Sequence, residues 1–288
     1  KFILSNEKKE TIRHHIRKIM PKEFKGKKWE DIPQIDKDMF IYIDARDYLR
    51  SIHAIQAIER LEFHSPVTFF AGENGRSFRF APASDWQALK TAADAAVMPA
   101  QLGAGQQAQL VDLAQAVPGL KFDLRYAQAD NCFGQALTDD QRAFLDADAA
   151  QALAQAQQYL KPYGYGILVW EAYRPWSVSK LAYDALPADK KSMLPAPEAG
   201  FSHNTGRSID VSLYLLATGE NAGMISGFDE PSVRQYASFA GGTTLERYRR
   251  DLLRSAMQMA GFTASETEWW HFDYGDIKGF AHLNVKPQ

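Results

Sequence analysis

Hydrophobic and polar residues alternate along residues 207–213, which is the pattern of a β-strand with two unlike faces. One face carries Ile209, Val211 and Leu213, and the other carries Ser208, Asp210 and Ser212. An aromatic-rich run over residues 269–274 predicts a second strand. Gly206 permits a tight turn before the first strand, so a side chain from the preceding loop can reach back toward it.

Further periodic segments surround these two strands. A continuous apolar run predicts a buried strand over residues 165–170, and helical spacing predicts helices over residues 85–97, 145–160 and 245–260. In the last helix the sequence predicts two faces. The core face would hold Leu245, Leu252, Leu253, Ala256 and Met259, and the solvent face Arg247, Arg249, Arg250 and Arg254.

The pattern as a whole indicates an α+β protein with two domains, because 288 residues exceed one average domain. Residues 1–100 combine strand, helix and hairpin patterns and carry no catalytic constellation, so they are predicted to form a small α+β domain of their own. Residues 101–118 are rich in Ala, Gln, Gly and Pro and are predicted to connect the domains, with partial helix over 108–116. Residues 119–288 form the second predicted domain.

The second domain contains the residues that can support chemistry. His203 precedes Asp210 by seven positions, and Glu268 precedes His271 by three. Three N/O ligands with a separate carboxylate suit a catalytic zinc site, where a fourth position stays open for water. In a regular strand Glu268 would face away from His271, so this geometry requires a bend near residues 268–269. The alternative is an ordinary surface pair or satisfied core residues.

These two segments resemble the zinc D-Ala-D-Ala dipeptidases of the vancomycin-resistance type, within the D,D-peptidases that share His-x6-Asp and Glu-x-x-His motifs. The resemblance covers residues 119–275 and implies a mostly antiparallel central sheet flanked by helices. It also implies one Zn²⁺ per chain, held by His203, Asp210 and His271, with Glu268 as general base.

Four more residues receive roles from the same resemblance. Arg174, in a Tyr-Arg-Pro segment, would stabilise the oxyanion, and Asp229 would bind the free amino group of the substrate. Tyr173 and Ser202 are also assigned to substrate binding, although the family usually has Ser at the position of Phe201. The alternatives are a salt bridge from Arg174 to Glu171 and a turn role for Asp229.

The implied function is zinc-dependent hydrolysis of D-Ala-D-Ala or a related D,D-dipeptide in cell-wall peptide metabolism. One alternative is a D,D-carboxypeptidase or endopeptidase acting on peptidoglycan stem peptides. The other is a non-catalytic zinc-dependent binding module, although retention of both Glu268 and Arg174 argues against it.

Composition narrows these possibilities. A net charge of −2 does not indicate nucleic-acid binding, and no apolar run approaches the eighteen residues of a membrane span. The single cysteine, Cys132, excludes an intrachain disulfide and cannot build a thiolate zinc site alone. Residues 1–30 hold ten Lys and Arg against four Glu, so the amphipathic helix predicted there either is solvated or contacts an anionic surface.

The expected location follows from the implied substrate and from the first residue. Because the chain starts at Lys1 without Met, it is expected to be a mature or trimmed form. A bacterial periplasmic or envelope location is predicted, with the cytoplasm as the alternative.

Overall fold

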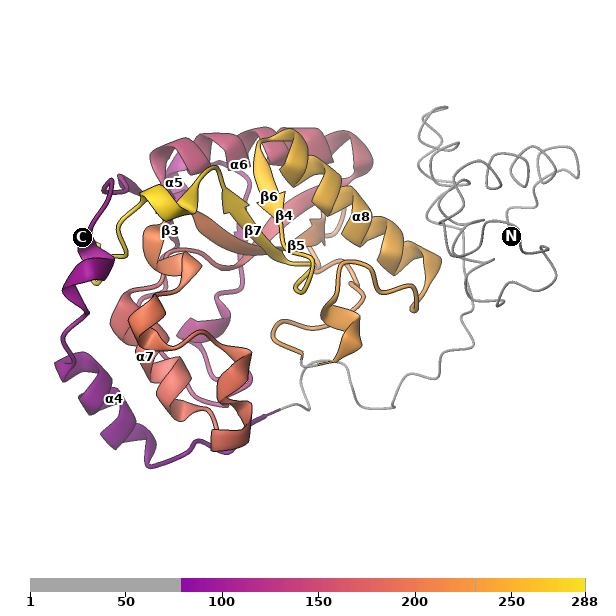
Figure 1. The fold of residues 1–288 in the computed structure, drawn as a ribbon. Helices are drawn as coiled ribbons and strands as arrows, with labels where there is room; N and C mark the ends of the chain where they lie inside the picture. The colour runs from indigo at the N-terminus through magenta and orange to yellow at the C-terminus, as the bar shows by residue number, and fades with distance from the viewer. Residues whose placement is uncertain (1–78, 231, 288) are drawn as a thin grey trace, which may run out of the picture.

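The structure, a computed structural model, describes residues 79–230 and 232–287 (Figure 1). The basic N-terminal helix and the strand and hairpin patterns predicted before residue 79 lie outside these ranges. None of the described helices has the length and hydropathy needed to cross a membrane.

A five-stranded sheet forms the centre of the described domain, with the strand order β2-β4-β5-β7-β6. Its members are β2 (Lys121–Phe122), β4 (Tyr165–Glu171), β5 (Ser208–Leu215), β7 (His271–Tyr274) and β6 (Phe262–Ala264). The β2–β4 pair is parallel, and the other neighbours are antiparallel. The predicted combination of helices with a mostly antiparallel sheet is therefore present in this part of the chain.

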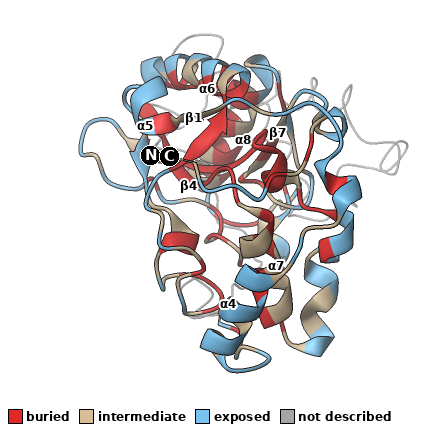
Figure 2. Ribbon diagram, turned by 90° about the vertical axis from the view of Figure 1, so that its left-hand side faces the viewer, coloured by how far each residue is buried: buried red, intermediate tan, exposed pale blue. Residues whose placement is uncertain are grey.

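The larger helices form two pairs. In one, α6 (Ala147–Leu160) and α8 (Thr244–Met259) lie side by side and contact strands of the sheet; in the other, α4 (Trp86–Ala95) packs against α7 (Trp176–Ala185). In Figure 1 the first pair lies above the sheet and the second pair below it. The Ala-rich sequence of α6 lets it approach β4 closely. Figure 2 shows the central strands buried and the outer helix faces exposed, as expected for a layered domain.

A two-stranded sheet joins β1 (Leu110–Asp112) to β3 (Phe144–Asp146). The short helix α5 (Leu113–Ala116) follows β1, and its first residue, Leu113, is buried in the main core. Within the predicted helix over residues 108–116, residues 110–112 form a strand and only residues 113–116 are helical. This part of the connecting segment packs into the domain. The domain boundaries proposed from sequence stay a prediction.

Short 3-10 helices fill most of the remaining connections. They are η3 (Ala100–Gly103), η4 (Arg125–Ala127), η5 (Lys161–Tyr163), η6 (Ala188–Met193), η7 (Pro197–Ala199), η8 (Ser202–Thr205), η9 (Val233–Gln235) and η10 (Ile277–Gly279). Of these, η8 matters most for function because it leads through Gly206 into β5.

The two predicted faces of α8 are partly wrong. Arg247 and Arg250 are buried, whereas Met259, predicted to face the core, is 66% exposed. The Arg247 guanidinium donates to the carbonyl oxygens of residues 240–242, and Arg250 donates to the carbonyl of Phe239. These arginines are buried because they satisfy the backbone of the loop before the helix.

The turn at Gly206 requires glycine for two reasons. Its φ of 73° lies in the left-handed region, and an added Cβ would stand 2.6 Å from the Leu110 side chain. We expect Gly206→Ala to lower the free energy of unfolding by about 1–3 kcal/mol, through backbone strain and overpacking. Chemical denaturation measures this change.

The control for this measurement is Gly103→Ala, where φ is not positive and the nearest atom to an added Cβ is 4.0 Å away. That variant should stay within about 0.5 kcal/mol of the wild type. Equal stability of the two variants would contradict the role given to Gly206.

Candidate active site

Three neighbouring strands place one residue each in a row across the sheet. Asp210 in β5 is the direct cross-strand partner of His271 in β7, and on its other side it pairs with Glu171 in β4. A bulge between Val169 and Glu171 brings Glu171 into this row. Residues directly opposite each other point to the same face, so the three side chains meet on the polar face of β5.

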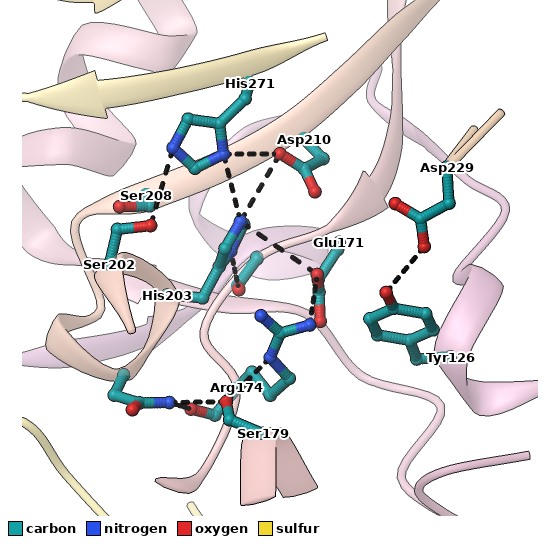
Figure 3. Close-up of polar contacts among 12 residues, drawn as sticks. Tyr126, Glu171, Arg174, Ser179, Ser202, His203, Ser208, Asp210, Asp229 and His271 are labelled. Carbon is teal, nitrogen blue, oxygen red and sulfur yellow. Dashed lines mark hydrogen bonds and ion pairs between the residues drawn. The ribbon is translucent and has the colours of Figure 1, made fainter. Parts of the chain in front are cut away.

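His203 completes the cluster from η8, just before the Gly206 turn (Figure 3). Its Nε2 lies 3.2 Å from His271 Nδ1 and 3.3 Å from Asp210 Oδ1. His271 Nδ1 lies 2.8 Å from Asp210 Oδ1. Donors that bind one tetrahedral ion at ~2.0–2.1 Å must stand roughly 3.3 Å apart, so these three atoms fit a single metal ion.

The ring nitrogen of each imidazole that points away from the cluster also has a hydrogen-bonding partner. His203 Nδ1 lies 2.8 Å from the carbonyl oxygen of Ala172, and His271 Nε2 lies 3.1 Å from Asp273 Oδ1. A proton on each outer nitrogen leaves the inner nitrogen with a free lone pair directed at the cluster. These contacts orient both rings as metal ligands.

The charges at the cluster favour a cation. Burial works against a charge on both imidazoles, but the neighbouring carboxylates outweigh it and raise both pKa values above the ordinary value. Asp210 acts on both rings, with Glu171 adding to it at His203 and Asp273 at His271. Burial also opposes the charge on Asp210, yet the nearby imidazoles lower the pKa of this carboxyl overall. A buried carboxylate that attracts positive charge this strongly suits a divalent ion.

Glu268 faces the same cavity of about 450 Å³ as the three donors. The required bend is present: residues 268–270 form a turn before β7, closed by a 3.2 Å hydrogen bond from the His271 N–H to the Glu268 carbonyl. Burial raises the pKa of the Glu268 carboxyl, and repulsion from Asp210 adds to the rise. A glutamate with a raised pKa beside the cluster is suited to accept and return a proton near neutral pH.

Arg174 is buried at the end of β4 and lines the same cavity. Its Nη1 donates to Glu171 Oε2 at 3.1 Å, and its Nε donates to Ser179 Oγ at 2.8 Å. The salt bridge considered from sequence is thus real, and it fixes the guanidinium beside the cavity. The two interpretations of Arg174 are compatible, because the bridge uses only part of its donors.

Asp229 also lines this cavity and has a positive φ of 52°. Tyr126 Oη donates to Asp229 Oδ2 at 2.6 Å. In Figure 3 the other carboxylate oxygen of Asp229 points toward the three candidate metal ligands. Burial raises the pKa of Asp229 to about 7, against the hydrogen bond from Tyr126, and neighbouring carboxylates such as Glu268 contribute to the rise. The position suits an anchor for a small cation.

The two remaining predicted residues differ in position. Ser202 lines the cavity, with Oγ 3.5 Å from His271 Nε2. Tyr173 does not line it: its hydroxyl donates to the Val285 carbonyl at 2.9 Å and accepts from the Val285 N–H at 3.1 Å. Tyr173 therefore binds the C-terminal tail through its hydroxyl. Its side chain does not line the cavity in which it was predicted to contact the substrate.

Sequence reasoning missed three partners in this site. Asp273 could have been found, because it lies two residues after His271 on the same strand face. Tyr126 and Cys132 reach Asp229 across about one hundred residues, and no local pattern marks such a contact.

A largely buried His-Asp-His donor set, with a separate glutamate and arginine around one cavity, defines a metal-dependent hydrolase site. A family model described as D-ala-D-ala dipeptidase matches residues 106–285. The chain belongs to this family of metallopeptidases. The family resemblance inferred from its motifs is confirmed, and the match extends further toward both ends than residues 119–275.

Several bacterial relatives carry the name D-alanyl-D-alanine dipeptidase. The chain is 33% identical to that of Escherichia coli K12 over 165 residues, covering 57% of this chain and 84% of the relative. It is 34% identical to that of Enterococcus faecalis V583 over 172 residues, covering 54% and 85%. For the Enterococcus faecium protein the identity is 32% over 178 residues, covering 56% and 88%.

Proposed function

We propose that this protein is a zinc-dependent dipeptidase that hydrolyses D-Ala-D-Ala or a related D,D-dipeptide in cell-wall peptide metabolism. The observation that carries the proposal is the convergence of His203, Asp210 and His271 on one point, with Glu268 in the same cavity. The names of the bacterial relatives support the choice of substrate.

The donor set of two imidazoles and one carboxylate suits zinc, which accepts N and O ligands in tetrahedral sites. When bound, zinc supplies a Lewis acid that polarises a carbonyl and lowers the pKa of a water molecule. Glu268 accepts the proton of the attacking water and delivers it to the departing amine. Arg174 donates hydrogen bonds to the carbonyl oxygen as negative charge develops on it.

Asp229 selects dipeptides in this proposal. Its free carboxylate oxygen faces the cavity and would pair with the α-ammonium group of the substrate. A buried ammonium needs a counter-charge, so an N-blocked peptide or an internal peptide bond would leave Asp229 unpaired. Ser202 is proposed to contact the substrate on the opposite side, next to His271.

The test compares release of D-Ala from D-Ala-D-Ala, N-acetyl-D-Ala-D-Ala and a stem pentapeptide, using protein freed of metal and then reloaded with zinc. We expect zinc-dependent release from the free dipeptide only. Preference for the pentapeptide would indicate a carboxypeptidase instead, and zinc binding without any hydrolysis would indicate a binding module.

Asp229→Asn provides a specific test of the ammonium anchor. We expect it to raise KM for D-Ala-D-Ala by about 10- to 100-fold, because removing one partner of a buried charge pair is costly. In the wild type Asp229 must be deprotonated to pair, so kcat/KM should increase as pH rises through its pKa of about 7. This increase should be weaker in Asp229→Asn, and identical pH profiles would count against the anchor.

We also propose a periplasmic or envelope location in a bacterium, where wall peptides are remodelled. Fractionation of the native host tests this against the cytoplasmic alternative.

A further inference from the structure

A small recess of about 50 Å³ opens off the metal cavity beside Asp229. It shares Asp229, Glu268, Tyr126, Met193 and Leu194 with that cavity. Its inner walls are mainly apolar and come from Phe80, Cys132, Phe133 and Leu186. The recess is therefore a side extension of the proposed substrate site. Its polar lining comes from Asp229, Glu268 and Gln235, and its apolar walls favour an uncharged group.

Cys132 stands where the recess meets the proposed ammonium anchor. Its Sγ lies 3.7 Å from Asp229 Oδ2, the same oxygen that accepts from Tyr126. Two protein donors thus hold Oδ2 and leave the other oxygen for a ligand. Figure 3 shows the contact from Tyr126. An ammonium group bound there would sit at the mouth of the recess.

We propose that the recess receives the side chain of the substrate's N-terminal residue, and that Cys132 sets its depth and so limits this side chain to a small one. The inference rests on the proposed dipeptidase function. In a dipeptide the side chain leaves the same carbon as the ammonium group, so anchoring the nitrogen at Asp229 brings the side chain to the recess. A cavity volume of about 50 Å³ holds a few atoms at most, given that a cavity of ~150 Å³ accommodates one benzene molecule.

The chemistry of Cys132 fits a packing role in this wall. Burial raises the pKa of its thiol well above the ordinary range, and the nearby Asp229 adds to the rise. The side chain therefore stays neutral and acts as a small apolar group with a weak donor. A larger residue at this position would fill the recess, and a smaller one would deepen it.

The experiment measures kcat/KM for Gly-D-Ala, D-Ala-D-Ala and D-Val-D-Ala in the zinc-loaded wild type and in three variants. We expect Cys132→Leu to lower the ratio of D-Ala-D-Ala to Gly-D-Ala by about 10-fold or more, since a methylene in such a pocket is worth ~10- to 200-fold. Cys132→Ala should raise the ratio of D-Val-D-Ala to D-Ala-D-Ala by about 10-fold. Cys132→Ser, of similar size, is the matched control and should keep both ratios within about twofold of the wild type, whatever it does to the individual rates.

Unchanged ratios in both the Leu and the Ala variants would overturn the inference while leaving the dipeptidase proposal intact. If the Leu variant does not fold, as circular dichroism would show, the Ala and Ser variants decide the question between them. Wild-type protein that binds zinc and hydrolyses no dipeptide would instead remove the proposed function, and this inference with it.

Discussion

Glu268→Gln is expected to lower kcat for D-Ala-D-Ala by about 10²- to 10⁴-fold while zinc stays bound, because loss of a general base removes this much rate. Gln keeps the size and hydrogen bonding of Glu but cannot accept a proton. The three metal donors are contributed by other residues, so the metal site should be unaffected. Steady-state kinetics together with elemental analysis of the same sample measure both quantities.

The matched control is Glu266→Gln, two residues earlier in the chain. Glu266 is exposed and pairs with Arg254 on the surface, away from the metal donors. The chemical change is the same, and kcat should stay within about twofold because a surface ion pair contributes little. Near-normal turnover of zinc-loaded Glu268→Gln would remove Glu268 from the mechanism.

The sequence predicted the strands that carry the site residues better than it predicted how those strands pair. Alternation over residues 207–213 correctly separated Asp210 from the core residues Ile209 and Val211. It could not reveal that Asp210 lies directly opposite His271, because strand register depends on pairing between residues far apart in the chain. The motif resemblance supplied that connection instead.

Two differences between the sequence prediction and the structure have clear physical causes. The helical pattern of α8 predicts that every arginine faces solvent. Arg247 is buried instead, because backbone carbonyls accept hydrogen bonds from its guanidinium. Tyr173 was assigned to substrate binding by the family resemblance, and its hydroxyl contacts the C-terminal tail. Adjacent side chains in an extended segment point to opposite sides, and only Arg174 faces the metal cavity.

Loss of a metal ligand should have the other large effect. His203→Ala removes one of three donors and is expected to abolish stoichiometric zinc binding, with activity falling by at least ~10²-fold at equal total zinc. Asp273→Asn leaves all three donors in place and changes the outer contact of His271, together with the hydrogen bond that Asp273 accepts from the Ser208 hydroxyl. Because the orienting contact to a metal-binding imidazole is weakened, zinc affinity should fall by about 10- to 100-fold, and excess zinc should restore most of the activity.

The contrast between these two variants distinguishes a metal ligand from a residue that orients one. Zinc titration followed by activity would give a shifted but complete curve for Asp273→Asn and no recovery for His203→Ala. Glu268→Gln should bind zinc like the wild type and remain inactive at every concentration. If His203→Ala retained one tightly bound zinc per chain, the convergence of its Nε2 with Asp210 and His271 would not be a metal site, and the role of Glu268 would lose its basis.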